Sequence, residues 1–91
     1  METETLDQLQ TETRYPDMYK VILHNDDKNS MVRVVAVLMQ IFNLVYEKAV
    51  VLMIEAHKKG LALVTVTHLE RAELYAQQMA SAGLVGTIEK A

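Results

Sequence analysis

The stretch YKVILHNDDKNSM, residues 19–31, decides the fold of this chain. Its first half, with Met18 before it, is rich in β-branched and aromatic residues and predicts a strand over Met18–His24. The polar run Asn25–Ser30 predicts a loop, and Ser30 or Asn29 is suited to cap a following helix, because a short polar side chain accepts hydrogen bonds from the first free N–H groups. The loop also places an amide and two adjacent carboxylates at the end of the strand.

Outward from this stretch, the hydrophobic pattern alternates between helical and strand spacing. Gly60 and Gly83 each follow a helical segment and are suited to end it, because glycine adopts the left-handed backbone conformation without a Cβ penalty. The order β-α-α-β-α-β indicates an α+β domain in which three helices pack on one face of a small three-stranded antiparallel sheet. The elements predicted after the loop are a helix over Met31–Phe42 ended by Asn43, a helix from Tyr46 or Glu47 to Lys59, a strand over Leu61–Thr67, a helix over Leu69–Ser81 and a strand over Leu84–Glu89.

The length of 91 residues predicts one folded domain, and 51% hydrophobic residues are typical of a globular chain. Residues 1–15 are rich in Glu, Thr and Gln and predict a flexible N-terminal extension, which Pro16 closes. The domain itself is therefore expected over residues 16–91.

The charge and the residue types exclude several classes of function. The net charge is -3 and no basic block is present, which argues against a nucleic-acid partner. There are no cysteines, so disulfides and thiolate metal sites are excluded. The longest apolar run, Val34–Met39, is too short to span a bilayer, so no membrane association is expected. We expect a cytoplasmic protein, or a protein of the plastid stroma if a transit peptide has been removed.

Three features together predict a binding site for a cation with an apolar tail. Asn25 and Asp27 offer acceptor oxygens, and neutral His57 offers a lone pair. Met53 lies four residues before His57, on the same helix face, so that a thioether and an imidazole share one pocket. Met31 and Val34 come from the preceding predicted helix. A primary ammonium, such as the first amino group of a protein chain, suits these acceptors, and capture of an N-terminal amine is a known mode of recognition.

The same residues allow other interpretations. Adjacent Asn and Asp residues in a loop commonly form turns with their own backbone, and a histidine on an apolar helix face is often a satisfied residue at the edge of the core. A metal site could use His24, Asp26, Asp27 and His57, but strand alternation points His24 and its neighbours to different faces. Hydrolysis by Asp26 and Asp27 is disfavoured, because adjacent carboxylates rarely flank one bond from two sides.

The quoted loop, the helical Met53 and His57, and the ending Thr87–Ala91 resemble the ClpS family over most of the chain from Tyr15. ClpS proteins are non-enzymatic adaptors with a small α/β fold and no cofactor, and they deliver N-degron substrates to a Clp ATPase and its protease. The resemblance implies two partners, a substrate whose first residue is bulky and apolar or aromatic, and the N-terminal domain of a ClpA- or ClpC-type AAA+ ATPase. It also implies that the unfoldase engages the extension.

By this resemblance, Asn25, Asp27 and His57 would hold the substrate's α-amino group, and Asp26 would shape the loop and hold the peptide backbone. Met31 would act as the gate that rejects β-branched first residues. The remaining residues of the side-chain pocket would be Asn29, Val34, Met53, Ala56 and Leu84.

The sequence departs from the family's usual pattern in four places. Asn29 stands where threonine is usual, within a loop that lacks the common aromatic and proline, and Ala56 stands where valine is common. The connection after Thr67 is shorter than usual. Residues 82–84, Ala-Gly-Leu, stand where the family usually has a more polar segment that contains a proline. These departures indicate a divergent paralogue with altered specificity or altered docking.

The altered loop and Ala56 motivate a second hypothesis, an alternative to the N-degron adaptor, in which the chain is a regulatory subunit that modulates the substrate choice of the ATPase without binding N-degrons. A ribosome-associated domain is a third hypothesis, because a region of a ribosomal stalk protein resembles this fold. A metal-dependent enzyme is a fourth.

Overall fold

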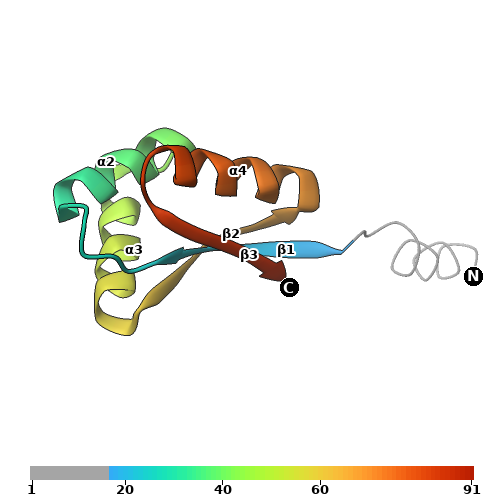
Figure 1. Ribbon diagram of the computed structural model, residues 1–91, viewed down its shortest axis with the longest axis horizontal. Helices are drawn as coiled ribbons and strands as arrows, with labels where there is room; N and C mark the ends of the chain where they lie inside the picture. Colours follow the sequence, from blue (N-terminus) through green and yellow to red (C-terminus); the bar gives the residue numbers. More distant parts are fainter. Residues whose placement is uncertain (1–16) are drawn as a thin grey trace, which may run out of the picture.

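A computed structural model describes residues 17–91, and Figure 1 shows its path. The extension predicted for residues 1–15 lies outside the described residues. The predicted α+β order is confirmed. The elements are β1 (Met18–His24), α2 (Met31–Phe42), α3 (Tyr46–Lys59), β2 (Leu61–His68), α4 (Leu69–Ser81) and β3 (Val85–Lys90).

The three strands form one antiparallel sheet in the order β2-β1-β3, so the strand that leads to the polar loop is the central one. The β1–β2 register shifts between Val21 and Ile22, which face Thr65 and Leu63, respectively. The helices cover one face of the sheet (Figure 1). A central strand has both edges paired, and this gives the loop at its end a fixed point of departure.

The core lies between that face and the helices. Val21 and Leu23 alternate along β1 and point into it, where they meet Leu38 of α2 and Met79 of α4, and all four are among the largest fully buried side chains. Lys20 is only partly buried, as period-two alternation requires for a residue on the opposite face. The end of β1 is therefore held by packing right up to the residue before His24.

The helix ends follow the local chemistry of the sequence. Ser30 caps α2, and its side chain accepts from the Arg33 N–H at 3.1 Å. Gly60 ends α3 with a φ of 94° and donates to the Ala56 carbonyl. Asn43 ends α2 in the same left-handed region, with a φ of 55°. These three ends agree with the prediction.

The turn after α4 is a Schellman motif. The Gly83 N–H donates to the Ala80 carbonyl at 3.0 Å, and the Leu84 N–H donates to the Met79 carbonyl at 2.9 Å. Leu84 therefore belongs to the helix end, and β3 begins one residue later than predicted, at Val85. At the other end of α4, β2 runs one residue further than predicted, to His68, and the helix follows without a loop. No helix in residues 17–91 has the length and apolarity needed to cross a membrane.

Candidate functional site

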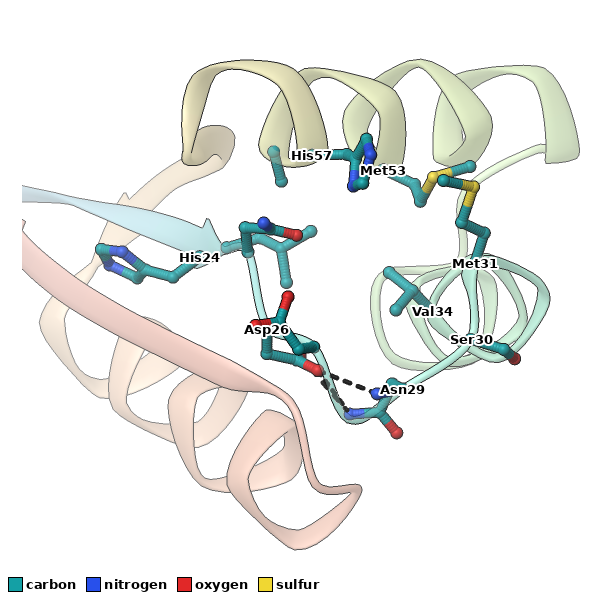
Figure 2. Close-up of a pocket in the computed structure, with 12 residues that line it drawn as sticks. His24, Asp26, Asn29, Ser30, Met31, Val34, Met53 and His57 are labelled. Carbon is teal, nitrogen blue, oxygen red and sulfur yellow. Dashed lines mark hydrogen bonds between the residues drawn. The ribbon is translucent and has the colours of Figure 1, made fainter.

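A cavity of about 290 Å³ opens where β1 ends, between the polar loop and helices α2 and α3. Figure 2 shows Met31 and Val34 reaching it from α2, and Met53 and His57 from α3. One side of the cavity carries amide, carboxylate and imidazole groups, and the other side is apolar. The residues that line it are Leu23, His24, Asn25, Asp26, Asp27, Asn29, Ser30, Met31, Val34, Met53, Ala56 and His57.

The loop that forms the polar side is attached to the body of the domain at both ends. The backbone N–H of Asn25 donates to the Gly60 carbonyl at 3.0 Å, which ties the loop to the turn that ends α3. The side-chain Nδ2 of Asn29 donates to the Gly83 carbonyl at 2.8 Å, which ties it to the turn that ends α4. The first bond also sets the distance between the loop and His57, because His57 lies in the last turn of α3.

Asp26 holds the inside of the loop. Its Oδ1 accepts from the backbone N–H groups of Lys28 and Asn29 at 2.8 and 2.9 Å, and Figure 2 shows bonds from Asp26 to Asn29. The hydrogen bond from the Asn29 N–H is the main reason that the pKa of Asp26 is lowered. For Asp26, the turn-forming interpretation of the sequence is therefore correct, and this carboxylate shapes the loop.

Asn25 and Asp27 are different from Asp26. Both are exposed, and neither side chain hydrogen-bonds another side chain or backbone group within residues 17–91. Both residues line the cavity, and their side-chain oxygens remain available to accept hydrogen bonds from a ligand. His57 is exposed at the rim of the cavity on the α3 side. These three residues, predicted together from the sequence, do lie around one cavity.

The apolar side consists of soft and tightly packed parts. Met31 is 49% exposed at the mouth, whereas Ala56 is 3% exposed in the wall. Met53 and Val34 are half-buried between them. Met31 and Met53 reach toward each other across the gap between α2 and α3 (Figure 2), and both also line a second apolar groove on the far side. An unbranched thioether has three rotatable bonds, so this wall can adapt to an occupant.

Two differences from the predicted site stand out. Leu84 does not line the cavity; it is 4% exposed and packs in the core, since the Schellman turn directs it there. Leu23 and Ser30 do line the cavity and were not predicted. Strand alternation could have identified Leu23, because it points inward directly before the loop.

His24 borders the cavity, but its ring turns away toward β3 (Figure 2) and its Nε2 lies 2.7 Å from Thr87 Oγ1. It is therefore separated from Asp26, Asp27 and His57, as strand alternation predicted. No three His, Asp or Glu side chains within residues 17–91 are grouped as a metal ion would require.

Comparison with known proteins assigns the chain to a family. The family described as "ATP-dependent Clp protease adaptor protein ClpS" matches residues 14–85. The chain belongs to the ClpS family. A ClpS adapter of Synechococcus elongatus is 44% identical over 98% of this chain and 97% of its own length, and one of Gloeobacter violaceus is 41% identical with the same coverage. A chloroplastic ClpS adapter of Chlamydomonas reinhardtii is 41% identical over 81% of this chain.

A solved structure extends the likeness to the whole fold. Agrobacterium tumefaciens ClpS2, determined with bound L-phenylalaninamide, superposes with a TM-score of 0.82 at 31% identity and covers 85% of this chain and 100% of its own. The predicted resemblance to ClpS is thus confirmed, and with it the prediction of a protease adaptor rather than an enzyme.

Proposed function

We propose that this ClpS chain captures substrate proteins by their first residue and delivers them to a Clp AAA+ ATPase for degradation. The observation that carries the proposal is the division of the cavity into two halves. Asn25, Asp27 and His57 supply acceptors at one end, and apolar side chains supply the other. A first residue is the part of a protein chain that joins a free ammonium to a side chain at one carbon.

The polar half is suited to the α-amino group. An ammonium has three N–H donors, and the amide oxygen of Asn25, the carboxylate of Asp27 and the imidazole of His57 are three acceptors from two elements. An acetylated or internal residue has no cation to offer, and it would leave Asp27 without a charged partner. The polar half thus selects for the free end of a chain, whatever the side chain.

The apolar half is suited to a bulky first side chain. Met31, Val34, Met53 and Ala56 line it, and Met31, which is exposed at the mouth, would act as the gate against β-branched residues. The ligand of the Agrobacterium ClpS2 structure, L-phenylalaninamide, combines an amine, a benzyl group and an amide in place of the first peptide bond. This combination is what the two halves of the cavity would bind here.

The energetics require more than these two contacts. Burial of a Leu- or Phe-sized side chain contributes about 1.5–3 kcal/mol. A hydrogen bond to a charged group contributes about 1.5–3 kcal/mol. A micromolar complex needs about 8 kcal/mol. We therefore propose that several of the three acceptors act together, and that the substrate backbone also contacts the loop near Asp26.

The second partner would be the N-terminal domain of a ClpA- or ClpC-type ATPase, in the cytoplasm or the plastid stroma. Family membership supports this assignment. The predicted role of the extension in hand-over falls on residues outside the described part of the chain.

Binding of short fluorescent peptides that differ only in residue one tests the proposal. Peptides that begin with Leu, Phe, Tyr, Trp, Met or Ile should bind differently from one another. Acetyl-Leu should bind at least tenfold more weakly than Leu, since each hydrogen bond to the charged ammonium contributes about 1.5–3 kcal/mol and about 1.4 kcal/mol corresponds to a tenfold change. Equal binding of Leu and acetyl-Leu would refute the proposal. Tight binding to the ATPase without any peptide binding would favour the regulatory subunit, which Asn29 and Ala56 motivate.

A further inference from the structure

Asn29 of the binding loop and Arg33 in the first turn of α2 connect this loop to the α4–β3 turn. Arg33 donates from Nε to Asn29 Oδ1 at 2.9 Å and from Nη2 to the Ala82 carbonyl at 2.5 Å. Asn29 in turn donates from Nδ2 to the Gly83 carbonyl at 2.8 Å. The loop and the α4–β3 turn, which lie more than forty residues apart in the chain, are thus joined by two side chains and three hydrogen bonds.

Arg33 determines which way the Asn29 amide points. With Oδ1 held by the guanidinium, the NH2 group must face Gly83 and the Asp26 carboxylate, whose two oxygens lie 3.4 Å from Nδ2. The flipped amide would set its donors against Arg33 and its oxygen against the Gly83 carbonyl. Arg33 therefore does more than add one bond, because it selects the orientation in which Asn29 can hold the loop.

We propose that Arg33 and Asn29 are positioning residues that hold the binding loop in its peptide-competent shape from the α4–β3 turn. This inference rests on the proposed function. The loop has its other attachment at the Asn25 N–H to Gly60 bond, and Asp26 folds the segment between the two attachments. Without the Arg33–Asn29 link the loop would be tied at one end, and the acceptor of Asp27 would no longer be fixed relative to Asn25.

The link also explains how an asparagine can line a cavity intended for apolar side chains. Both donors and the acceptor of its amide are directed at Gly83, Asp26 and Arg33, so none has to be satisfied by the ligand. A buried ligand surface opposite an unpaired amide would bind less well. Asn29 can therefore stand at this position without a demand for a polar first residue.

Two substitutions test the hydrogen bonds of Arg33 and those of the Asn29 amide separately. Arg33→Met keeps the length of the stem and removes both of its bonds, whereas Asn29→Asp keeps an acceptor for Arg33 but replaces the Nδ2 donor by an oxygen that repels Asp26 and the Gly83 carbonyl. Each should weaken the binding of Leu-first and Phe-first peptides about tenfold, since one to two hydrogen bonds that order the loop are lost. Arg33→Lys, which can still reach one acceptor, should restore part of this loss.

Two matched controls separate the loss of the Arg33–Asn29 link from an added negative charge and from the removal of an arginine elsewhere in the domain. Gln40→Glu adds one negative charge to an exposed position of α2 that does not line the cavity, so it should bind peptides as well as the parent chain. Arg71→Met removes an arginine whose guanidinium stacks on Tyr75 of its own helix, 5.8 Å from the ring centre, and should leave peptide binding unchanged.

A second readout needs no ligand. The N–H groups of Lys28 and Asn29 keep the pKa of Asp26 low, so a loosened loop should let this pKa rise toward its ordinary value, as NMR titration of the Asp26 carboxyl carbon would report. In Arg33→Met we expect the rise together with the tenfold loss. Parent-like peptide binding, or an unmoved Asp26 titration, would overturn the inference. If the parent chain itself binds no peptide, the proposed function fails, and the positioning of the loop is then judged by the Asp26 titration alone.

Discussion

Ala56 is the wall residue whose replacement should change which first residues bind. Its side chain is 3% exposed and lines the cavity of about 290 Å³. Ala56→Val adds two methyl groups at a position with packed core on one side and the cavity on the other, so the open space that they can enter is the cavity. The substitution should make the apolar half shallower and leave the acceptors at Asn25 and Asp27 in place.

The expected change in peptide affinity follows from how strongly an apolar pocket discriminates between side chains of different size. One methylene more or less in such a pocket changes binding by about 1–3 kcal/mol. A Phe-first peptide, which reaches deepest, should therefore bind roughly 5- to 150-fold more weakly to Ala56→Val. A Leu-first peptide ends earlier in the cavity and should change by less than about threefold, so the ratio of the two dissociation constants is the quantity to measure.

Fluorescence anisotropy with the two peptides gives this ratio, and Ala49→Val provides the control. Ala49 is fully buried on the same helix, two turns before Ala56, and does not line the cavity. Both substitutions place a β-branched residue in α3 and overpack the core by about 1–3 kcal/mol, which urea unfolding would measure. Only Ala56→Val should alter the Phe-to-Leu ratio.

Two results would refute this reasoning. If both peptides weaken equally in Ala56→Val, the added methyl groups act through general destabilisation rather than through the cavity. If Ala49→Val changes the ratio as much as Ala56→Val does, the preference for the first side chain is not set by the wall at Ala56.

Three further predictions concern single groups. Asp27→Asn should weaken all free-amine peptides about three- to tenfold with no change of preference, because a charged hydrogen bond becomes a neutral one, and a changed preference in the peptide series would contradict this. The lowered pKa of Asp26 means that its contribution to stability is complete above the ordinary value of 3.8 and is lost as the pH falls through the lowered pKa; Asp26→Asn should flatten the thermal stability between pH 5 and 2 relative to the parent, and parallel curves would oppose it. Gly86→Ala should lower the free energy of unfolding by about 1–3 kcal/mol, because its Cβ would lie 2.2 Å from the buried Met79 Cε, and the loss measured by urea unfolding should shrink in a Met79→Ala background.

The fold could be predicted from the sequence where local chemistry decides an element's end. Ser30 caps α2 and Gly60 ends α3 as their residue types indicate, so the bounds of these helices were correct. The residues around Leu84 form strands readily, so the sequence predicts Leu84 in the last strand, whereas β3 begins at Val85. The competing signal is a glycine followed by an apolar residue shortly after a helix, since in a Schellman motif that apolar residue packs back on the helix, here near Met79.

The site could be predicted only in part, because its members are joined by contacts that no local pattern carries. Asn25 and Asp27 lie in the loop that follows the predicted strand, so the sequence alone predicts that their acceptor groups lie close to each other. The spacing of Asn29 and Arg33 permits a contact within one helical turn, but their bonds to Ala82 and Gly83 depend on where α4 ends in space. Long-range hydrogen bonds of this kind are the part of a site that a single sequence leaves open.

The cavity joins a fixed polar half to an adaptable apolar half, and this division matches what the two halves would have to recognise. Every first residue brings the same ammonium, so the loop that carries Asn25 and Asp27 can be held at Gly60 on one side and at Gly83 on the other without loss of range. The side chains differ from one substrate to the next, and there the wall contains Met31 and Met53, whose thioethers can repack. The packed Ala56 in the cavity wall then limits depth, so range and selectivity arise from different residues of one small cavity.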